Sequence, residues 1–185
     1  MKRREAIAGL GALGLLGAGG AVATGRLDLN EVAGRSDGDE RIEPLELERF
    51  EAPGSAPGVE TVPEEGRVTY IAMFATWCGT CRRKMDPLGK VADTLDEEVQ
   101  FVSVTNEPVG RTVEPADVVD WWVEYDGDWA VAHDDDLELT RRVDARGVPY
   151  SVVLDADNRI TWSDSGYKNA DEIRTHIDEA RDGVE

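Results

Sequence analysis

The sequence predicts one α/β domain with a mixed central sheet, helices on both faces and an N-terminal hairpin. Between residues 67 and 181, short apolar runs alternate with segments whose apolar residues recur at helical spacing. Near the end, two strand-like runs flank a turn at residues 155–158, which adds an antiparallel pair to an alternating pattern. The 185 residues suffice for one such domain and a leader, but not for two cores of normal size.

The first elements follow from local composition. Residues 45–50 and 59–62 are expected to pair as strands across a Pro/Gly-rich turn. Residues 67–75 form a nearly continuous apolar run, which is typical of a strand buried on both faces. A helix is expected at residues 78–95, with one apolar stripe facing the core.

The later elements complete the alternation. In chain order we expect a strand at 99–105, a helix at 115–125, a strand at 129–132, a short helix at 136–143, strands at 150–154 and 159–162, and a helix at 169–181. Trp121 and Trp122 are adjacent on a helix and point in different directions, so we expect one in the core and one partly exposed. The acidic run 134–136 lacks the spacing of a calcium loop and is expected to cap the following helix.

The N-terminal segment, residues 1–25, differs from the rest. It begins with Met1-Lys2-Arg3-Arg4, and residues 6–25 carry no charge. This pattern is typical of an export signal, and the arginine pair resembles a twin-arginine signal. An uncleaved membrane anchor over residues 6–25 is the alternative, although 13 of those 20 residues are Gly or Ala.

Both interpretations place the main domain, residues 44–185, outside the cytoplasm. Residues 26–43 are acidic and polar without an apolar period, so we expect a flexible linker there.

The charge balance excludes some functions. Asp and Glu number 39 and Lys and Arg 20, which gives a formal net charge of −19. No nucleic-acid partner is expected, because phosphate binding needs a basic face. The hydrophobic fraction of 41% excludes wholesale disorder. The acid-rich, Lys-poor composition resembles that of proteins from salt-loving organisms; an acidic protein from an ordinary host is the alternative.

Two cysteines, Cys78 and Cys81, carry the candidate chemistry in the string Trp-Cys-Gly-Thr-Cys at residues 77–81. They open a predicted helix, whose free N–H groups and partial positive charge stabilise a thiolate at Cys78. Cys81 lies one turn on, where it can attack a mixed disulfide. Gly79 is expected to keep the turn tight, and Trp77 to shield one side of the site.

Other roles for the pair have less support. A zinc ribbon needs four ligands, and His133 and His176 fit no compact site with the cysteines. A copper site would need a nearby donor, for which His133 is the candidate. A structural disulfide with so short a loop would stabilise the fold weakly. We therefore expect no metal and no cofactor beyond the Cys78–Cys81 disulfide.

The string at residues 77–81 resembles the thioredoxin active site, which usually reads Trp-Cys-Gly-Pro-Cys. Gly147-Val148-Pro149, directly before the strand at 150–154, resembles the cis-proline segment of the same family. The segment 115–132 and the hairpin near 45–62 resemble additions of the TlpA/ResA-like branch. The resemblance covers residues 43–185 and implies a thioredoxin fold with a central helix–strand insertion.

The resemblance also implies a function. Cys78 would be the attacking thiol and Cys81 the resolving thiol of an exported protein-disulfide reductase, with Gly79 and Thr80 in support. Trp77, Val148 and Pro149 would contact the substrate. The implied partners are exported proteins with disulfides, including apocytochrome c, and a membrane or exported thiol that donates electrons. A disulfide oxidase or isomerase, and a redox-inert binding module or metal chaperone, remain alternatives.

Several residues depart from the family pattern. Thr80 replaces the usual Pro, Tyr150 replaces the Thr after the cis-proline, and Ala72 stands where a buried Asp or Asn often helps proton transfer. Glu107 is a candidate proton relay, but in so acidic a chain we expect a solvated loop carboxylate.

The run Arg82-Arg83-Lys84 is basic in an otherwise acidic domain. It could stabilise the Cys78 thiolate or dock an acidic partner. We expect an exposed helix face that balances nearby acids.

Overall fold

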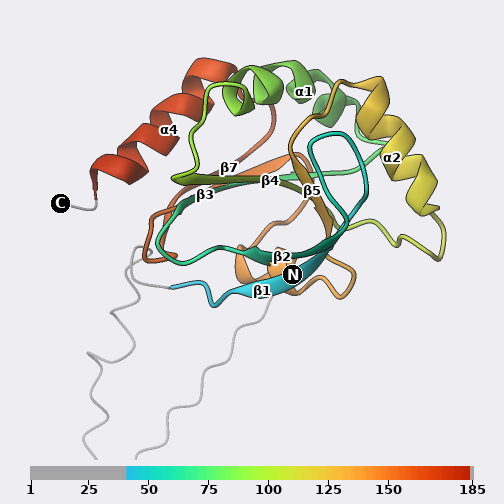
Figure 1. The fold of residues 1–185 in the computed structure, drawn as a ribbon, viewed down its shortest axis with the longest axis horizontal. Coiled ribbons are helices and arrows are strands. Elements are labelled where there is room, and N and C mark those ends of the chain that lie inside the picture. The colour runs from blue at the N-terminus through green and yellow to red at the C-terminus, as the bar shows by residue number, and fades with distance from the viewer. Residues whose placement is uncertain (1–40, 184–185) are drawn as a thin grey trace, which may run out of the picture. The chain divides into compact units, whose positions relative to one another are not determined.

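A seven-stranded mixed sheet forms the centre of the computed structural model, which describes residues 41–183 (Figure 1). The strand order is β2-β1-β5-β4-β3-β6-β7. The strands are β1 Leu45–Arg49, β2 Gly58–Val62, β3 Val68–Phe74, β4 Val99–Thr105, β5 Ala130–His133, β6 Tyr150–Leu154 and β7 Ile160–Ser165. The helices are α1 Gly79–Ala92, α2 Pro115–Glu124, α3 Glu138–Arg142 and α4 Ala170–Asp182. The predicted α/β class and the N-terminal hairpin are confirmed.

The predicted leader lies outside the described residues. This applies to the export signal or anchor at residues 1–25 and to most of the linker at 26–43. No helix within residues 41–183 is long and apolar enough to cross a membrane.

The central strand β3 is buried along its whole length. It pairs in parallel with β4, with Phe74 opposite Thr105, and antiparallel with β6, with Met73 opposite Tyr150. The chain that leaves β3 therefore lies between the chain that leaves β4 and the chain that enters β6. These three segments meet at one edge of the sheet.

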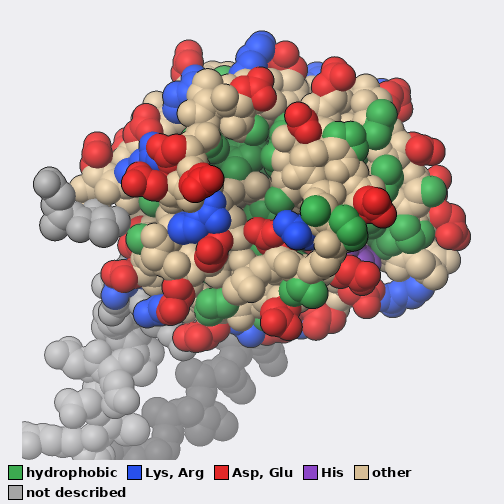
Figure 2. Space-filling model, viewed as in Figure 1, with side chains coloured by type: hydrophobic (Ala, Val, Ile, Leu, Met, Phe, Trp, Pro, Cys, Tyr) green, Lys and Arg blue, Asp and Glu red, His purple; other side chains and the backbone are tan. Residues whose placement is uncertain are grey.

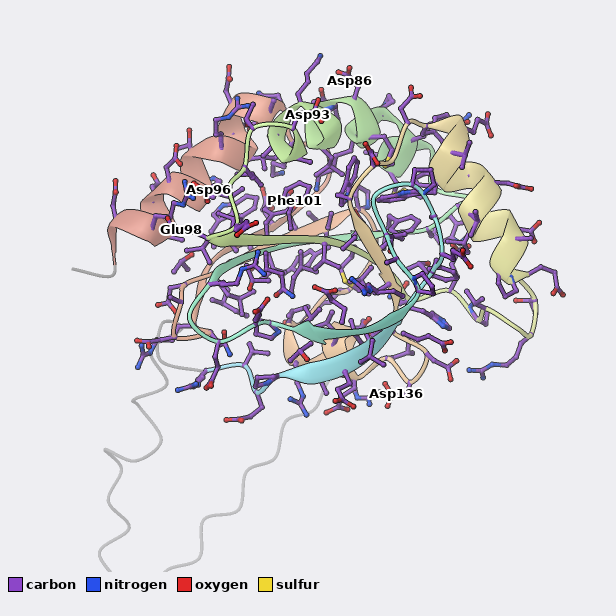
Figure 3. The ribbon with its side chains drawn as sticks, viewed as in Figure 1. Asp86, Asp93, Asp96, Glu98, Phe101 and Asp136 are labelled. Atoms are coloured by element: carbon purple, nitrogen blue, oxygen red, sulfur yellow. A yellow bond between two sulfur atoms is a disulfide. The ribbon has the colours of Figure 1, made fainter. Side chains whose placement is uncertain are left out.

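The two faces of the sheet carry different side chains. Helices α1, α2 and α4 cover one face in Figure 1, which we call the aromatic face. Its rings are Tyr70, Phe74, Phe101, Trp121, Trp122 and Trp129. Neighbouring rings are in contact: Tyr70 stacks on Phe101 with centroids 4.9 Å apart, and Trp122 meets Trp129 edge to face at 4.7 Å. Figure 3 shows Phe101 between the sheet and the helices.

The opposite face is aliphatic and is covered by α3 and the hairpin. Leu139 and Val143 from α3 and Leu47 and Val62 from the hairpin pack against it. Each face therefore has its own apolar core, and helices lie on both faces as predicted.

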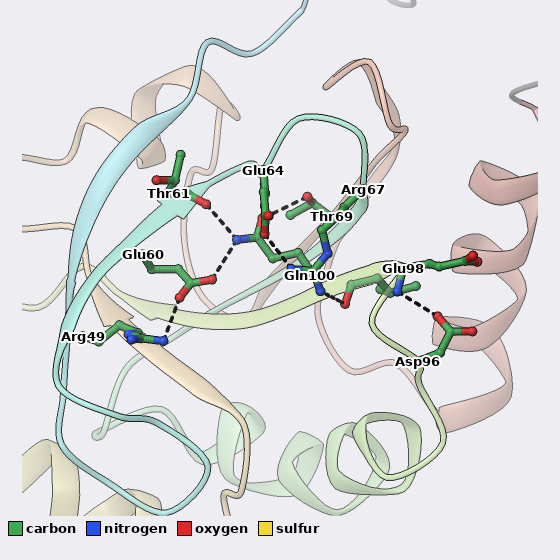
Figure 4. Close-up of polar contacts among 10 residues, drawn as sticks. Arg49, Glu60, Thr61, Glu64, Arg67, Thr69, Asp96, Glu98 and Gln100 are labelled. Atoms are coloured by element: carbon green, nitrogen blue, oxygen red, sulfur yellow. Dashed lines mark hydrogen bonds and ion pairs between the residues drawn. The ribbon is translucent and has the colours of Figure 1, made fainter.

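Gln100 of β4 fixes the hairpin to the sheet (Figure 4). Its amide nitrogen donates to Glu60 Oε1 at 2.8 Å and to the Thr61 carbonyl at 2.7 Å. Its amide oxygen accepts from Glu64 N at 2.9 Å and from Thr69 Oγ1 at 3.0 Å. This buried amide joins β2, β3 and β4 through four hydrogen bonds. Breaking one of them would leave a buried polar group unpaired, which is costly, so the amide holds the hairpin firmly.

The prediction that one of the paired tryptophans is partly exposed was wrong. Trp121 stacks on Phe74 with centroids 5.0 Å apart, and Trp122 Nε1 donates to the Pro53 carbonyl at 3.1 Å. Both are buried, because Trp121 packs on Phe74 and the loop at Pro53 covers the Trp122 ring. Gly127 permits this packing, because a Cβ atom there would lie 2.2 Å from the Trp122 ring.

The predicted turn at residues 155–158 and the predicted cap of the short helix are both confirmed. Asn158 takes a positive φ of 62° in the β6–β7 turn. Asp134 caps α3: its carboxylate accepts from Leu139 N at 3.0 Å and from Thr140 N at 2.8 Å. The remaining acids are mostly superficial, and Figure 2 shows them scattered over the visible face among fewer basic groups.

Candidate active site

The cysteine pair lies where the loop after β3 enters α1. Cys78 is the N-cap residue of α1, and its Sγ accepts a hydrogen bond from Cys81 N at 3.1 Å. The two cysteines form a disulfide with Cα atoms 5.2 Å apart. When the bond is reduced, the helix N–H groups and the helix dipole favour negative charge on Cys78. The local geometry therefore supports a reactive thiolate at this residue.

A groove beside the disulfide contains the predicted proline. The Val148–Pro149 peptide bond is cis, as the resemblance implied. The groove has a volume of about 640 Å³ and is lined by Thr80, Asp144, Arg146, Gly147, Val148, Pro149, Tyr150, Ser165 and Gly166. The structure thus places Thr80, Val148 and Pro149 along one groove.

The backbone of Val148 is open to a partner. Within residues 41–183, neither its N–H nor its carbonyl takes part in a hydrogen bond. The carbonyl of Pro149, in contrast, accepts from Gly166 N at 2.9 Å. An extended peptide in the groove could pair with the free groups of Val148, as a strand pairs with a sheet edge.

Trp77 is next to the disulfide in the chain and is 73% exposed, so most of its indole is in water. Gly79 is placed differently from the expectation. Gly79 has no positive φ, and the nearest atom to a Cβ there would be an Arg82 nitrogen at 3.8 Å. The turn between the cysteines therefore does not need glycine.

Glu107 is buried, which corrects the expectation of a solvated loop carboxylate. It is 4% exposed and follows β4, next to the chain that leaves β3. Its carboxylate accepts from Thr76 N at 2.8 Å, from Thr76 Oγ1 at 2.9 Å and from Thr105 Oγ1 at 3.2 Å. His133 Nε2 lies 2.9 Å from the Glu107 carbonyl oxygen. Glu107 thereby braces the loop that carries Trp77 and Cys78.

The basic run is split between surface and core, so the exposed-face prediction holds for only part of it. Arg82 and Arg83 are exposed, and the Arg82 guanidinium lies 5.6 Å from the Tyr125 ring centroid. Lys84 is 1% exposed. The helical spacing could have revealed this, since Cys81, Lys84 and Leu88 share the buried face of α1.

The amine of Lys84 lies in a small polar cluster under α1. Its Nζ donates to Ser151 Oγ, and the Tyr70 hydroxyl donates to the same oxygen at 3.0 Å. Burial lowers the pKa of Lys84 to about 7; the positive charge of Lys168 acts in the same direction, and Asp164 opposes it. Burial raises the pKa of Tyr70, so its phenol stays neutral.

Within the described part of the chain, no group of three or more His, Cys, Asp and Glu side chains could hold a metal ion. The cysteine pair at the start of α1 is a group that can perform disulfide exchange.

Comparisons with known proteins agree with the geometry. The family model described as Redoxin matches residues 55–180. An uncharacterized protein of Haemophilus influenzae is 23% identical over 112 residues, which is 60% of this chain and 71% of the relative.

Solved structures with the same fold include two that act on disulfides by their descriptions. A thiol-disulfide isomerase from Corynebacterium glutamicum has a TM-score of 0.64 and 17% identity, covering 78% of this chain and 97% of that one. A secreted disulfide oxidoreductase of Mycobacterium tuberculosis has a TM-score of 0.60 and 15% identity, with coverages of 73% and 95%. These likenesses confirm the predicted thioredoxin fold.

Proposed function

We propose that this chain, which belongs to the Redoxin family of thiol–disulfide oxidoreductases, is a protein-disulfide reductase that works outside the cytoplasm. The observation that carries the proposal is the Cys78–Cys81 disulfide at the start of α1, beside a groove with a free backbone edge at Val148. A helix start activates the thiol, and the groove offers a place for the polypeptide that bears the target disulfide.

The reaction proceeds in two exchanges. In the reduced enzyme, the Cys78 thiolate attacks one sulfur of the substrate disulfide, and the other substrate sulfur leaves as a thiolate and takes up a proton. The Cys81 thiol then loses its proton and attacks Cys78 Sγ. The Cys78–Cys81 bond forms, the mixed disulfide breaks, and the second substrate sulfur leaves as a thiolate that is protonated. Two electrons pass to the substrate, and the enzyme ends in the oxidised form.

The surroundings of the pair suit a protein substrate. Trp77 presents an exposed apolar ring next to the disulfide, and Val148 presents free backbone groups. Exported proteins with disulfides, including apocytochrome c, are the proposed substrates, and a membrane or exported thiol is the proposed electron donor. The basic, uncharged N-terminal pattern supports export through a twin-arginine-like signal or anchoring by residues 6–25. The net charge of −19 supports a salty habitat.

Substitution of each cysteine tests the proposal. Cys78→Ser is expected to abolish reduction of a protein disulfide, because the attacking sulfur is gone. Cys81→Ser is expected to accumulate a mixed disulfide with the substrate, because the resolving step is lost. A non-reducing gel and a turnover assay measure both. Normal turnover by both variants would overturn the proposal, and each variant serves as the control for the other.

An oxidase or isomerase is the second candidate. The helix start stabilises the reduced, thiolate form of Cys78, and such stabilisation makes a disulfide more oxidising. The reduction potential of the pair separates the two functions, since a low value supports a reductase and a high value an oxidant. Catalysed reshuffling of a scrambled protein would identify an isomerase.

A further inference from the structure

Lys84 is a buried charged residue that the exchange steps above do not use. It lies one helical turn after Cys81, on the same buried face of α1. Residues three apart on a helix are neighbours, with Cβ atoms about 5–6 Å apart. Both side chains are nearly inaccessible, with Cys81 2% and Lys84 1% exposed. The resolving cysteine and this lysine therefore project from neighbouring positions on the buried face of α1.

The charge of Lys84 has little compensation from the elements packed around it. From β3 and β6 it meets the neutral groups of Tyr70 and Ser151, with Nζ 5.9 Å from the Tyr70 ring centroid. From β7 the acid that acts on it is Asp164, but that carboxylate is paired with Lys168 at 2.9 Å. Lys168 adds a like charge. Lys84 makes no ion pair with any residue in the described range.

A buried amine without a counter-ion gives up its proton readily, which is why the pKa of Lys84 lies near 7 in the disulfide form. The facing position on β3 supplies no acid, since Ala72 pairs with Ser151 there. Reduction of the disulfide produces two thiols. Cys78 is the N-cap residue, where the helix start favours its thiolate, and Cys81 is the thiol that shares the buried face of α1 with Lys84. A thiolate at Cys81 would be the counter-ion that Lys84 lacks.

We propose that, in the reduced enzyme, the Cys81 thiol and the Lys84 amine share one proton. In one form Cys81 is a thiol and Lys84 a neutral amine; in the other Cys81 is a thiolate and Lys84 an ammonium ion. The proposal rests on the proposed disulfide exchange and assigns the proton of its second step. The Cys81 proton moves to Lys84 Nζ, the Cys81 thiolate attacks Cys78 Sγ, and the departing substrate thiolate receives a proton as Lys84 returns to its neutral form.

The test titrates Cys81 directly. In a Cys78→Ser background, the ultraviolet absorbance of the thiolate is followed against pH with Lys84 intact, with Lys84→Met, and with Lys90→Met. Lys84→Met is expected to raise the pKa of Cys81 by about one unit or more, because the thiolate loses its counter-ion. Lys90→Met is the matched control, since Lys90 is an exposed lysine of the same helix paired with Asp86. An unchanged Cys81 titration in folded Lys84→Met would overturn the proposal.

A second measurement covers the case in which Lys84→Met does not fold. The Lys84 amine of the unsubstituted protein is titrated by NMR in the oxidised and reduced states. Since coupling is reciprocal, the pKa of Lys84 is expected to be higher in the reduced state. Equal pKa values of Lys84 in the two states would also contradict the proposal.

Kinetics separate this proposal from the proposed function. With Lys84→Met, resolution of a preformed mixed disulfide is expected to slow about tenfold near neutral pH and to recover at higher pH, where Cys81 ionises unaided. If the unsubstituted enzyme resolves no mixed disulfide, the proposed function fails, yet the two titrations still report whether Cys81 and Lys84 are coupled.

Discussion

Glu107 and Lys84 are both buried charged residues beside the active site, but their neighbours treat them differently. Glu107 accepts three hydrogen bonds from Thr76 and Thr105. Lys84 donates to one hydroxyl and has no ion pair within residues 41–183. A buried polar group with several hydrogen bonds holds its surroundings in place, whereas a buried amine without a counter-ion readily loses its proton. Glu107 therefore braces the loop before the disulfide, and Lys84 serves as a proton-exchanging group.

The largest expected effect comes from removing the brace. Glu107→Ala leaves the Thr76 N–H and two hydroxyl groups without their acceptor, so we expect the free energy of unfolding to fall by about 3 kcal/mol. Chemical denaturation of the oxidised protein measures it. Glu97→Ala removes an exposed acid and is the control, with an expected change within about 0.5 kcal/mol. Equal stability of the two variants would show that Glu107 is no brace.

The next effect is a change in how stability depends on pH. Between pH 7 and 10.5 the unfolded chain carries a proton on Lys84 that the folded chain has released, so the free energy of unfolding rises with pH in that window. Lys84→Met should remove this rise, which amounts to about 1.4 kcal/mol per pH unit and roughly 2–3 kcal/mol over two units. The variant should thus be the more stable protein near pH 7.

Denaturation of the oxidised protein at several pH values measures the slope. Lys90→Met, which changes an exposed lysine, should keep the slope of the unsubstituted protein. If Lys84→Met kept it as well, the folded protein would hold Lys84 charged at neutral pH, and the contrast with Glu107 would disappear.

The smallest expected effect comes from removing one of the hydrogen bonds that Glu107 accepts. Thr76→Val removes the hydroxyl that donates to Glu107 at 2.9 Å but keeps the backbone N–H bond at 2.8 Å. We expect a loss of about 1 kcal/mol, seen as a lower midpoint of thermal unfolding. A loss as large as that of Glu107→Ala would mean that the hydroxyl, and not the carboxylate network, carries the stabilisation.

Most strands, helices and turns could be predicted from the sequence, because each depends mainly on residues that are close together in the chain. The apolar run of β3 and the turn with Asn158 depend on neighbouring residues only. The burial of Trp121 was not readable, because it depends on Phe74, far away in the chain. Helical periodicity places a residue on a side of a helix, but the tertiary neighbours decide how wide the buried side is.

The site was predicted in its chemistry but not in its support. Cys78, Cys81 and Pro149 belong to short strings, and the structure places them around one edge of the sheet. Glu107 gave no periodic signal, because its partner Thr76 becomes a neighbour only through the parallel pairing of β3 with β4. Lys84 did lie on the apolar stripe of α1, but its place in a basic run made an exposed position the better expectation.

The exposed indole of Trp77 makes the domain its own optical reporter. Trp121, Trp122 and Trp129 are buried and Trp162 is partly buried, whereas Trp77 is 73% open to water. Indole fluorescence shifts to longer wavelength in polar surroundings, so the red edge of the emission belongs mainly to the ring beside the disulfide. A polypeptide that covers this ring would move that emission toward the blue. Docking could therefore be followed in real time, without a label and apart from the chemistry.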